Sequence, residues 1–100
     1  MITARGDVLF EFGLLLHTPG ASAALGRNNE GSGMSYLFRH VTGDWGELDE
    51  EDRKEQTRSL KPDSPDQRIL SSYLLEDGTK VWLITEWDRS VTTMLLPEEY

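Results

Sequence analysis

Cysteine is absent from the 100 residues, and so is any long hydrophobic run. Without cysteine the chain can form no disulfide, offer no thiol nucleophile and bind no zinc through thiolates, which is typical of a reducing compartment. No apolar stretch approaches the roughly 20 residues that a membrane-spanning helix needs, and no basic leader with an apolar core opens the sequence. We therefore expect a cytoplasmic protein that does not insert into membranes.

Basic residues are also scarce, because 10 Lys and Arg stand against 18 Asp and Glu, for a formal net charge of −8. Affinity for nucleic acids comes mainly from Lys and Arg that displace counterions from phosphates, so direct nucleic-acid binding is not expected. An acidic chain favours basic partners instead. A chain of this length is expected to form one domain over residues 1–100.

The clearest secondary-structure pattern lies between residues 68 and 96. Three runs rich in β-branched, aromatic and aliphatic residues are separated by two short polar turns, which predicts three antiparallel strands. Asp77-Gly78 indicates a two-residue type I′ turn, which would place Leu74 opposite Val81. Both faces of this sheet carry apolar side chains, so we expect cover on each of them.

The residues before this region predict a fourth strand and short helices. Residues 8–16 alternate with period two around Gly13, which favours a strand. Thr18-Pro19 is typical of a helix start, and this helix is expected to end near Leu25. Asp49 can cap a further helix to about Leu60. Residues 26–33 and 61–67 are expected to be loops.

A helix is also predicted from apolar residues at helical spacing, which would face the core: Met34, Leu37, Phe38 and Val41. Arg39 and His40 fall off this stripe, towards its rim. Together the patterns predict an α+β fold, in which two to three short helices pack on an antiparallel sheet of three to four strands.

Residues 44–52 hold six carboxylates and no base. Acids early in a helix and bases later match the helix dipole, which gives this pattern a purely structural explanation. The functional alternative is a ridge whose carboxylates, about 6 Å apart on successive turns, imitate the phosphates of a DNA strand. Two tryptophans outside the apolar periodicity could anchor an interface. The candidate partner-binding residues are Asp44, Trp45, Glu47, Asp49, Glu50, Glu51, Asp52, Glu55 and Trp87.

Two other hypotheses follow from single side chains. A metal-assisted hydrolase or nuclease could use His40, Asp44, Asp49 and Asp88, but we favour the structural alternative, in which His40 hydrogen-bonds a helix-terminal carbonyl or Asp44. Trp45 and Trp87 could instead hold together a small regulatory homodimer. Arg89 could line a pocket mouth, or pair with Glu86 or Asp88.

Four segments together resemble a family of small uncharacterised proteins carried on plasmids, phages and integrated elements, some of them labelled as restriction-modification related. The segments are TPGA (18–21), RHVTGDWGELDEED (39–52), RILSSY (68–73) and ITEWDRSVTTMLLPEEY (84–100). The chain departs from the family at Trp87, where a small residue is preferred, and at Gln56-Thr57. Trp87 argues against a small-ligand pocket at that turn.

The resemblance implies a setting, in which mobile elements compete with host defence, and no mechanism. Combined with the charge, it gives our first hypothesis. We expect a non-enzymatic inhibitor of the anti-CRISPR or anti-restriction type, which needs no cofactor and covers the basic surface of a host nucleic-acid-binding complex.

Overall fold

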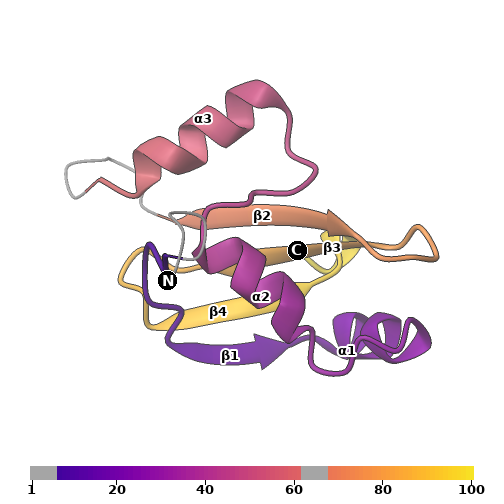
Figure 1. Ribbon diagram of the computed structural model, residues 1–100. Coiled ribbons are helices and arrows are strands. Elements are labelled where there is room, and N and C mark those ends of the chain that lie inside the picture. The colour runs from indigo at the N-terminus through magenta and orange to yellow at the C-terminus, as the bar shows by residue number, and fades with distance from the viewer. Residues whose placement is uncertain (1–6, 62–67) are drawn as a thin grey trace.

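Within residues 7–61 and 68–100, which the computed structural model describes, the chain forms a four-stranded sheet and three α-helices (Figure 1). The elements in chain order are β1 (Leu14–His17), α1 (Pro19–Arg27), α2 (Met34–Val41), α3 (Glu50–Ser59), β2 (Ile69–Leu74), β3 (Lys80–Thr85), β4 (Val91–Leu95) and the 3-10 helix η2 (Pro97–Glu99). The strand order in the sheet is β1-β4-β3-β2. No helix in the described ranges has the length and apolarity that crossing a membrane requires.

The α+β class is confirmed, and β2, β3 and β4 form the expected antiparallel meander. β1 lies parallel to β4, with Leu14 beside Val91 and His17 beside Met94, so the prediction of a wholly antiparallel sheet is wrong. Parallel neighbours require a long connection, and here three helices and two strands separate β1 from β4. The alternation of apolar and polar residues within a strand does not show whether the strand runs parallel or antiparallel to a partner that is far away in the sequence.

The β2–β3 hairpin differs from the prediction by one residue. Its loop has three residues: Gly78 N–H donates to the Leu75 carbonyl over 2.9 Å, and Leu75 N–H donates to the Thr79 carbonyl over 2.8 Å. Gly78 has a φ of +89°, as expected for a type I turn followed by a glycine bulge. Tyr73 therefore faces Val81, and the predicted register is wrong. Such a slip changes which side chains share a face.

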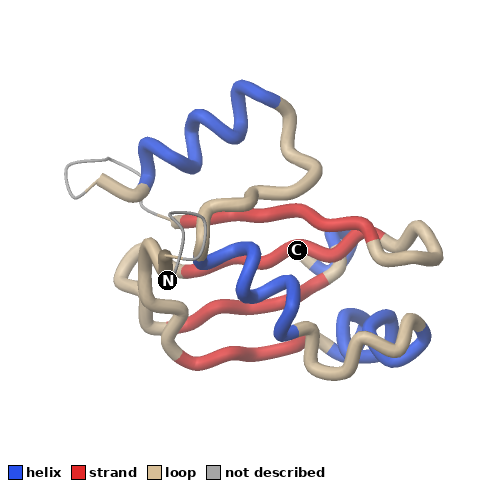
Figure 2. The backbone as a smooth tube through the Cα atoms, viewed as in Figure 1, coloured by secondary structure: helices blue, strands red, loops and turns tan. Residues whose placement is uncertain are grey.

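The core lies on one face of the sheet, over which α2 packs (Figures 1 and 2). Buried strand residues on this inner face include Tyr73, Val81, Leu83 and Met94. α1 adds its own buried residues, Ala21, Ala24 and Leu25. The opposite, outer face is covered incompletely, because Leu14 and Leu16 remain 61% and 45% exposed. Full cover of both faces was therefore a wrong expectation.

The first strand is shorter than predicted. It begins at Leu14, after Gly13, whose φ of +66° and close approach to the Ser90 carbonyl leave no space for a side chain. Phe10 and Phe12 precede the strand and still pack against the core.

α1 has the predicted Thr18 cap. α3 has the predicted Asp49 cap, whose side chain accepts the Asp52 N–H over 2.9 Å. The predicted buried stripe of α2 is half wrong, since Met34 and Phe38 are exposed. The buried residues of α2 are Tyr36, Leu37, His40 and Val41. Of the loop predicted for 61–67, the structure describes only Lys61.

Candidate partner-binding site

α3 begins a short distance after a segment that is fixed to the free edge of β2. Trp45 O accepts the Ser72 N–H over 3.2 Å, and Glu47 N–H donates to Ser72 O over 2.6 Å, which forms a parallel bridge between Gly46 and Ser72. Gly46 has a φ of +74°, and a Cβ there would lie 2.0 Å from the Ser72 carbonyl oxygen. Only glycine fits this position.

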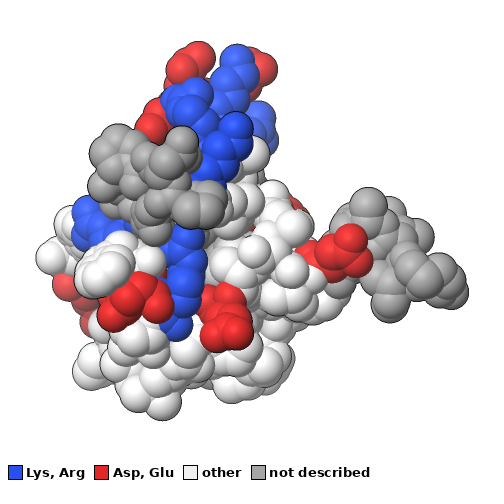
Figure 3. Space-filling model, turned by 90° about the vertical axis from the view of Figure 1, so that its left-hand side faces the viewer, with Lys and Arg blue, Asp and Glu red and all other residues white. Residues whose placement is uncertain are grey.

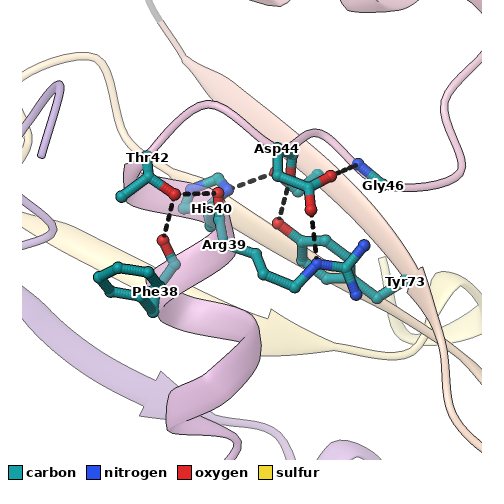
Figure 4. A network of polar contacts seen from close by, with 8 residues as sticks. Phe38, Arg39, His40, Thr42, Asp44, Gly46 and Tyr73 are labelled. Atoms are coloured by element: carbon teal, nitrogen blue, oxygen red, sulfur yellow. Dashed lines mark hydrogen bonds and ion pairs between the residues drawn. The ribbon is translucent and has the colours of Figure 1, made fainter. Parts of the chain in front are cut away.

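Asp44 holds the start of this segment (Figure 4). Its carboxylate accepts Arg39 Nε over 2.7 Å and the Gly46 N–H over 3.1 Å, while its carbonyl accepts the Tyr73 hydroxyl over 2.6 Å. Burial raises the pKa of Asp44, but the bonds from Arg39 and Gly46 outweigh it and leave this pKa below its ordinary value. Both carboxylate oxygens thus already have donors, so Asp44 positions this segment, while its 50% exposed side chain leaves the partner contact a prediction.

Trp45 anchors α3 and is not an interface residue. The side chain is 4% exposed, its ring lies 6.4 Å from that of Phe10, and its indole N–H donates to Thr57 Oγ1 on α3 over 3.2 Å. The prediction that Trp45 contacts a partner is therefore wrong. Gln56 adds a second tie, because its Oε1 accepts the Leu70 N–H of β2 over 2.7 Å.

The acidic residues gather at the first turn of α3. We call the following exposed set the acidic tip: Glu47, Asp49, Glu50, Glu51 and Asp52. Glu50 lies 3.9 Å from the ammonium of Lys54. Within the described ranges the other four carboxylates of the tip form no ion pair. The helix is otherwise solvated, since Ser59 is its one buried residue.

The predicted acidic ridge does not continue beyond this first turn. Glu55 is paired with Arg58, and Arg53 and Lys54 follow the tip directly. Figure 3 shows basic side chains beside acidic ones over the uppermost part of the molecule, where α3 lies. Glu55 thus stays a predicted partner contact that is paired with a base, and the acids of α3 without an ion pair lie in the tip.

His40 is fully buried and closes a hydrogen-bond chain within the core. Thr92 Oγ1 donates to the Phe12 carbonyl over 2.8 Å, so the single proton of Thr85 must go to Thr92 Oγ1, 2.6 Å away. Thr85 Oγ1 then accepts from His40 Nε2 over 2.9 Å, and His40 Nδ1 accepts from Ser71 over 2.6 Å. Burial favours the neutral imidazole, whose single proton is then on Nε2, so that Nδ1 is the acceptor in the contact with Ser71.

The proposed metal site is not assembled. Burial, with a smaller effect of Arg89, lowers the pKa of His40 to about 3, and both of its ring nitrogens already have partners in the core. Asp88 Oδ1 accepts the hydroxyl and the N–H of Ser90, which lower the pKa of Asp88. In the described part of the chain no three His, Asp or Glu side chains converge as metal ligands. The grouping of His40 with Asp44, Asp49 and Asp88 is wrong.

In the β3–β4 turn, the predicted partner-binding residue Trp87 remains accessible. Arg89 donates to the backbone carbonyls of Glu86 and Trp87 over 3.3 and 3.2 Å. Trp87 is 66% exposed and is available to a partner.

The sequence did not indicate the polar members of the core, because small polar residues in strands carry no mark of the partner that they will meet.

No protein-family model matches this chain, and no curated protein or solved structure matches it significantly.

Proposed function

We propose that this chain is a non-enzymatic binding protein that presents the acidic tip to a basic, nucleic-acid-binding surface of a host defence complex, as an anti-CRISPR or anti-restriction inhibitor would. The observation that supports the proposal is the position of the tip. α3 projects beyond the β2 edge of the sheet (Figure 1), and four of the five tip carboxylates have no ion pair within the described ranges. Lys and Arg that normally hold phosphates could pair with these carboxylates instead.

Glu47 distinguishes the tip from an ordinary helix N-terminus. The helix dipole favours acids in the first turn, which explains Glu50, Glu51 and Asp52 without a partner. Glu47 precedes the helix, and its exposed side chain extends the negative surface along the segment bound to β2. The local structure does not account for an acid at that position.

The basic residues of α3 limit how a partner can approach. A surface that lay along the whole helix would meet Arg53, Lys54 and Arg58 after the first turn. We therefore propose that contact is made end-on, through the tip. The net charge of −8 would speed the encounter with a basic surface at low salt.

The test uses two variants with equal changes in charge. The tip variant carries Glu47→Gln, Glu50→Gln, Glu51→Gln and Asp52→Asn, and keeps the Asp49 cap. The control variant carries Asp7→Asn, Glu11→Gln, Glu76→Gln and Glu98→Gln, four exposed acids elsewhere on the molecule.

Each immobilised chain is exposed to lysate of a bacterium with active restriction and CRISPR systems, and captured proteins are identified by mass spectrometry. We expect the wild type and the control variant to enrich the same basic nucleic-acid-binding complex and the tip variant to lose it. Equal capture by the tip variant would remove the proposal.

Trp87 supports a second candidate function, self-association. A tryptophan that is 66% exposed in a polar turn is the type of side chain that anchors interfaces. Light scattering would show a dimer for the wild type and a monomer for Trp87→Ser. A monomeric wild type would reject this alternative and leave the first proposal intact.

A further inference from the structure

α2 presents two large apolar side chains outwards. Met34 and Phe38 are one helical turn apart and 53% and 54% exposed, whereas the core takes other residues of the helix, namely Tyr36, Leu37, His40 and Val41. The fold therefore buries the rings of Tyr36 and His40, which carry polar atoms, and leaves the apolar side chains of Met34 and Phe38 in solvent. A cluster of exposed large apolar side chains commonly marks an interaction site.

A hollow of about 340 Å³ adjoins Phe38 at the C-terminal end of α2. It is lined by Phe38, Arg39, Thr42, Gly43 and Asp44. A Cβ at Gly43 would lie 2.9 Å from Leu9 Cδ1, so Leu9 lies beside this lining residue. Leu9 is itself 48% exposed. Phe38 thus gives the hollow an apolar wall, and Leu9 lies near it beside Gly43.

Arg39 supplies the polar group of the hollow. Its Nε donates to Asp44 Oδ2, and its guanidinium carbon lies 4.5 Å from the centre of the Tyr73 ring (Figure 4). Its two terminal nitrogens take part in no hydrogen bond with the residues that the structure describes, and 42% of the side chain is exposed. A guanidinium held in this way is pre-organised to receive a carboxylate on its remaining edge.

We infer that this outward face of α2 is a docking surface for a segment of another protein that carries a carboxylate beside a large apolar side chain. The apolar side chain would contact Phe38 and Met34, and the carboxylate would accept hydrogen bonds from the terminal nitrogens of Arg39. Arginine, phenylalanine and methionine are enriched at interface cores. This surface is separate from the acidic tip, which requires cations from its partner.

The area of the surface argues against a second copy of the chain as the occupant. Half of each of Leu9, Met34 and Phe38 amounts to roughly 100 Å² per side chain, about 300 Å² in all. Two such faces would bury about 600 Å² of apolar surface, or roughly 1,000 Å² once the polar share of an ordinary interface is added, which is below the roughly 1,200 Å² of stable interfaces. A short segment of a different protein fits these limits.

A peptide-display selection tests the inference with the intact protein. Random short peptides are selected on the immobilised wild type and counter-selected on Phe38→Ser, a substitution at a half-exposed site that leaves the buried core untouched. We expect the enriched peptides to carry Asp or Glu within a few residues of an aromatic or aliphatic residue. No enrichment, or enrichment of basic peptides, would overturn the inference.

One enriched peptide is then labelled with fluorescein, and its affinity for the wild type and for substituted proteins is measured by fluorescence anisotropy to identify the contacts. Phe38→Ser and Arg39→Lys should each weaken binding at least about tenfold, while Leu74→Ser, at a matched 48% exposed leucine of β2, should leave it unchanged. Replacing the peptide's carboxylate by its amide should weaken its binding to the wild type, but should change its binding to Arg39→Lys only a little. Equal losses in both proteins, or an effect of Leu74→Ser as large as that of Phe38→Ser, would contradict the assigned contacts.

Discussion

Acid should unfold this protein through His40. The side chain is 0% exposed, and burial lowers its pKa to about 3, with a smaller contribution from Arg89. In the unfolded chain a histidine titrates near 6.5. Between these two values the unfolded state binds a proton that the folded state does not. Stability is therefore fully present above about pH 6.5 and is lost as the pH falls towards 3.

The size of the effect follows from the interval between the two pKa values. Each pH unit within it removes about 1.4 kcal/mol from the free energy of unfolding, so the whole interval removes on the order of 5 kcal/mol. This is comparable with the total stability of many small domains. Asp44 and Asp88, whose pKa values are lowered, add a loss in the same direction at more acidic pH.

His40→Gln isolates the contribution of the imidazole. Glutamine can both donate and accept a hydrogen bond but does not titrate, so we expect it to cost about 1–3 kcal/mol at pH 7 through imperfect geometry. Its free energy of unfolding should then fall less steeply than that of the wild type between pH 6 and 4. Urea denaturation followed by tryptophan fluorescence gives both curves, since the Trp45 ring lies 6.1 Å from His40. Two parallel curves with a constant offset would refute a buried neutral imidazole.

Three substitutions test the scaffold. Gly46→Ala should destabilise the fold by roughly 3 kcal/mol or more, because the new Cβ would lie 2.0 Å from the Ser72 carbonyl oxygen; a loss below 1 kcal/mol in urea denaturation would contradict the geometry at β2. Tyr73→Phe removes the hydroxyl that donates to Asp44 O and should cost about 1–2 kcal/mol, and an unchanged thermal midpoint would show that this bond is not made. Trp87→Ser should alter the free energy of unfolding by no more than about 0.5 kcal/mol, so a large calorimetric shift would mean that Trp87 is packed.

Local signals in the sequence were sufficient for the helix caps and the meander. Thr18-Pro19 and Asp49 each act within one turn of the chain, so the residues that satisfy the free amides are visible in the sequence. The hairpin register was not determined in this way. Asp77-Gly78 suits either a two-residue turn or a three-residue turn with Gly78 as the bulge. In the structure Leu75 pairs with Thr79 and closes a three-residue loop, so every pair of facing residues is shifted by one position from the prediction.

The buried face of α2 could not be predicted from periodicity. A count of apolar residues places Phe38 inside, but the core takes His40, whose burial depends on hydroxyls from Ser71 and Thr85 on two distant strands. Trp45 was misjudged for the same reason, since Phe10 and Thr57 that enclose it lie far away in sequence. Among the acids, composition located the tip, but it did not show that Asp44 would be held by Arg39.

The most direct test of the acidic tip is a competition between this protein and DNA for the captured complex, measured at several salt concentrations. We predict that the wild type and the control variant displace DNA with the same affinity, which falls as salt rises. The tip variant should be roughly fourfold to about eight-hundredfold weaker at low salt, with a shallower salt dependence, because four exposed charge pairs contribute about 0.2–1 kcal/mol each. Equal affinity and equal salt dependence for the tip variant and the wild type would contradict the proposed role of the tip.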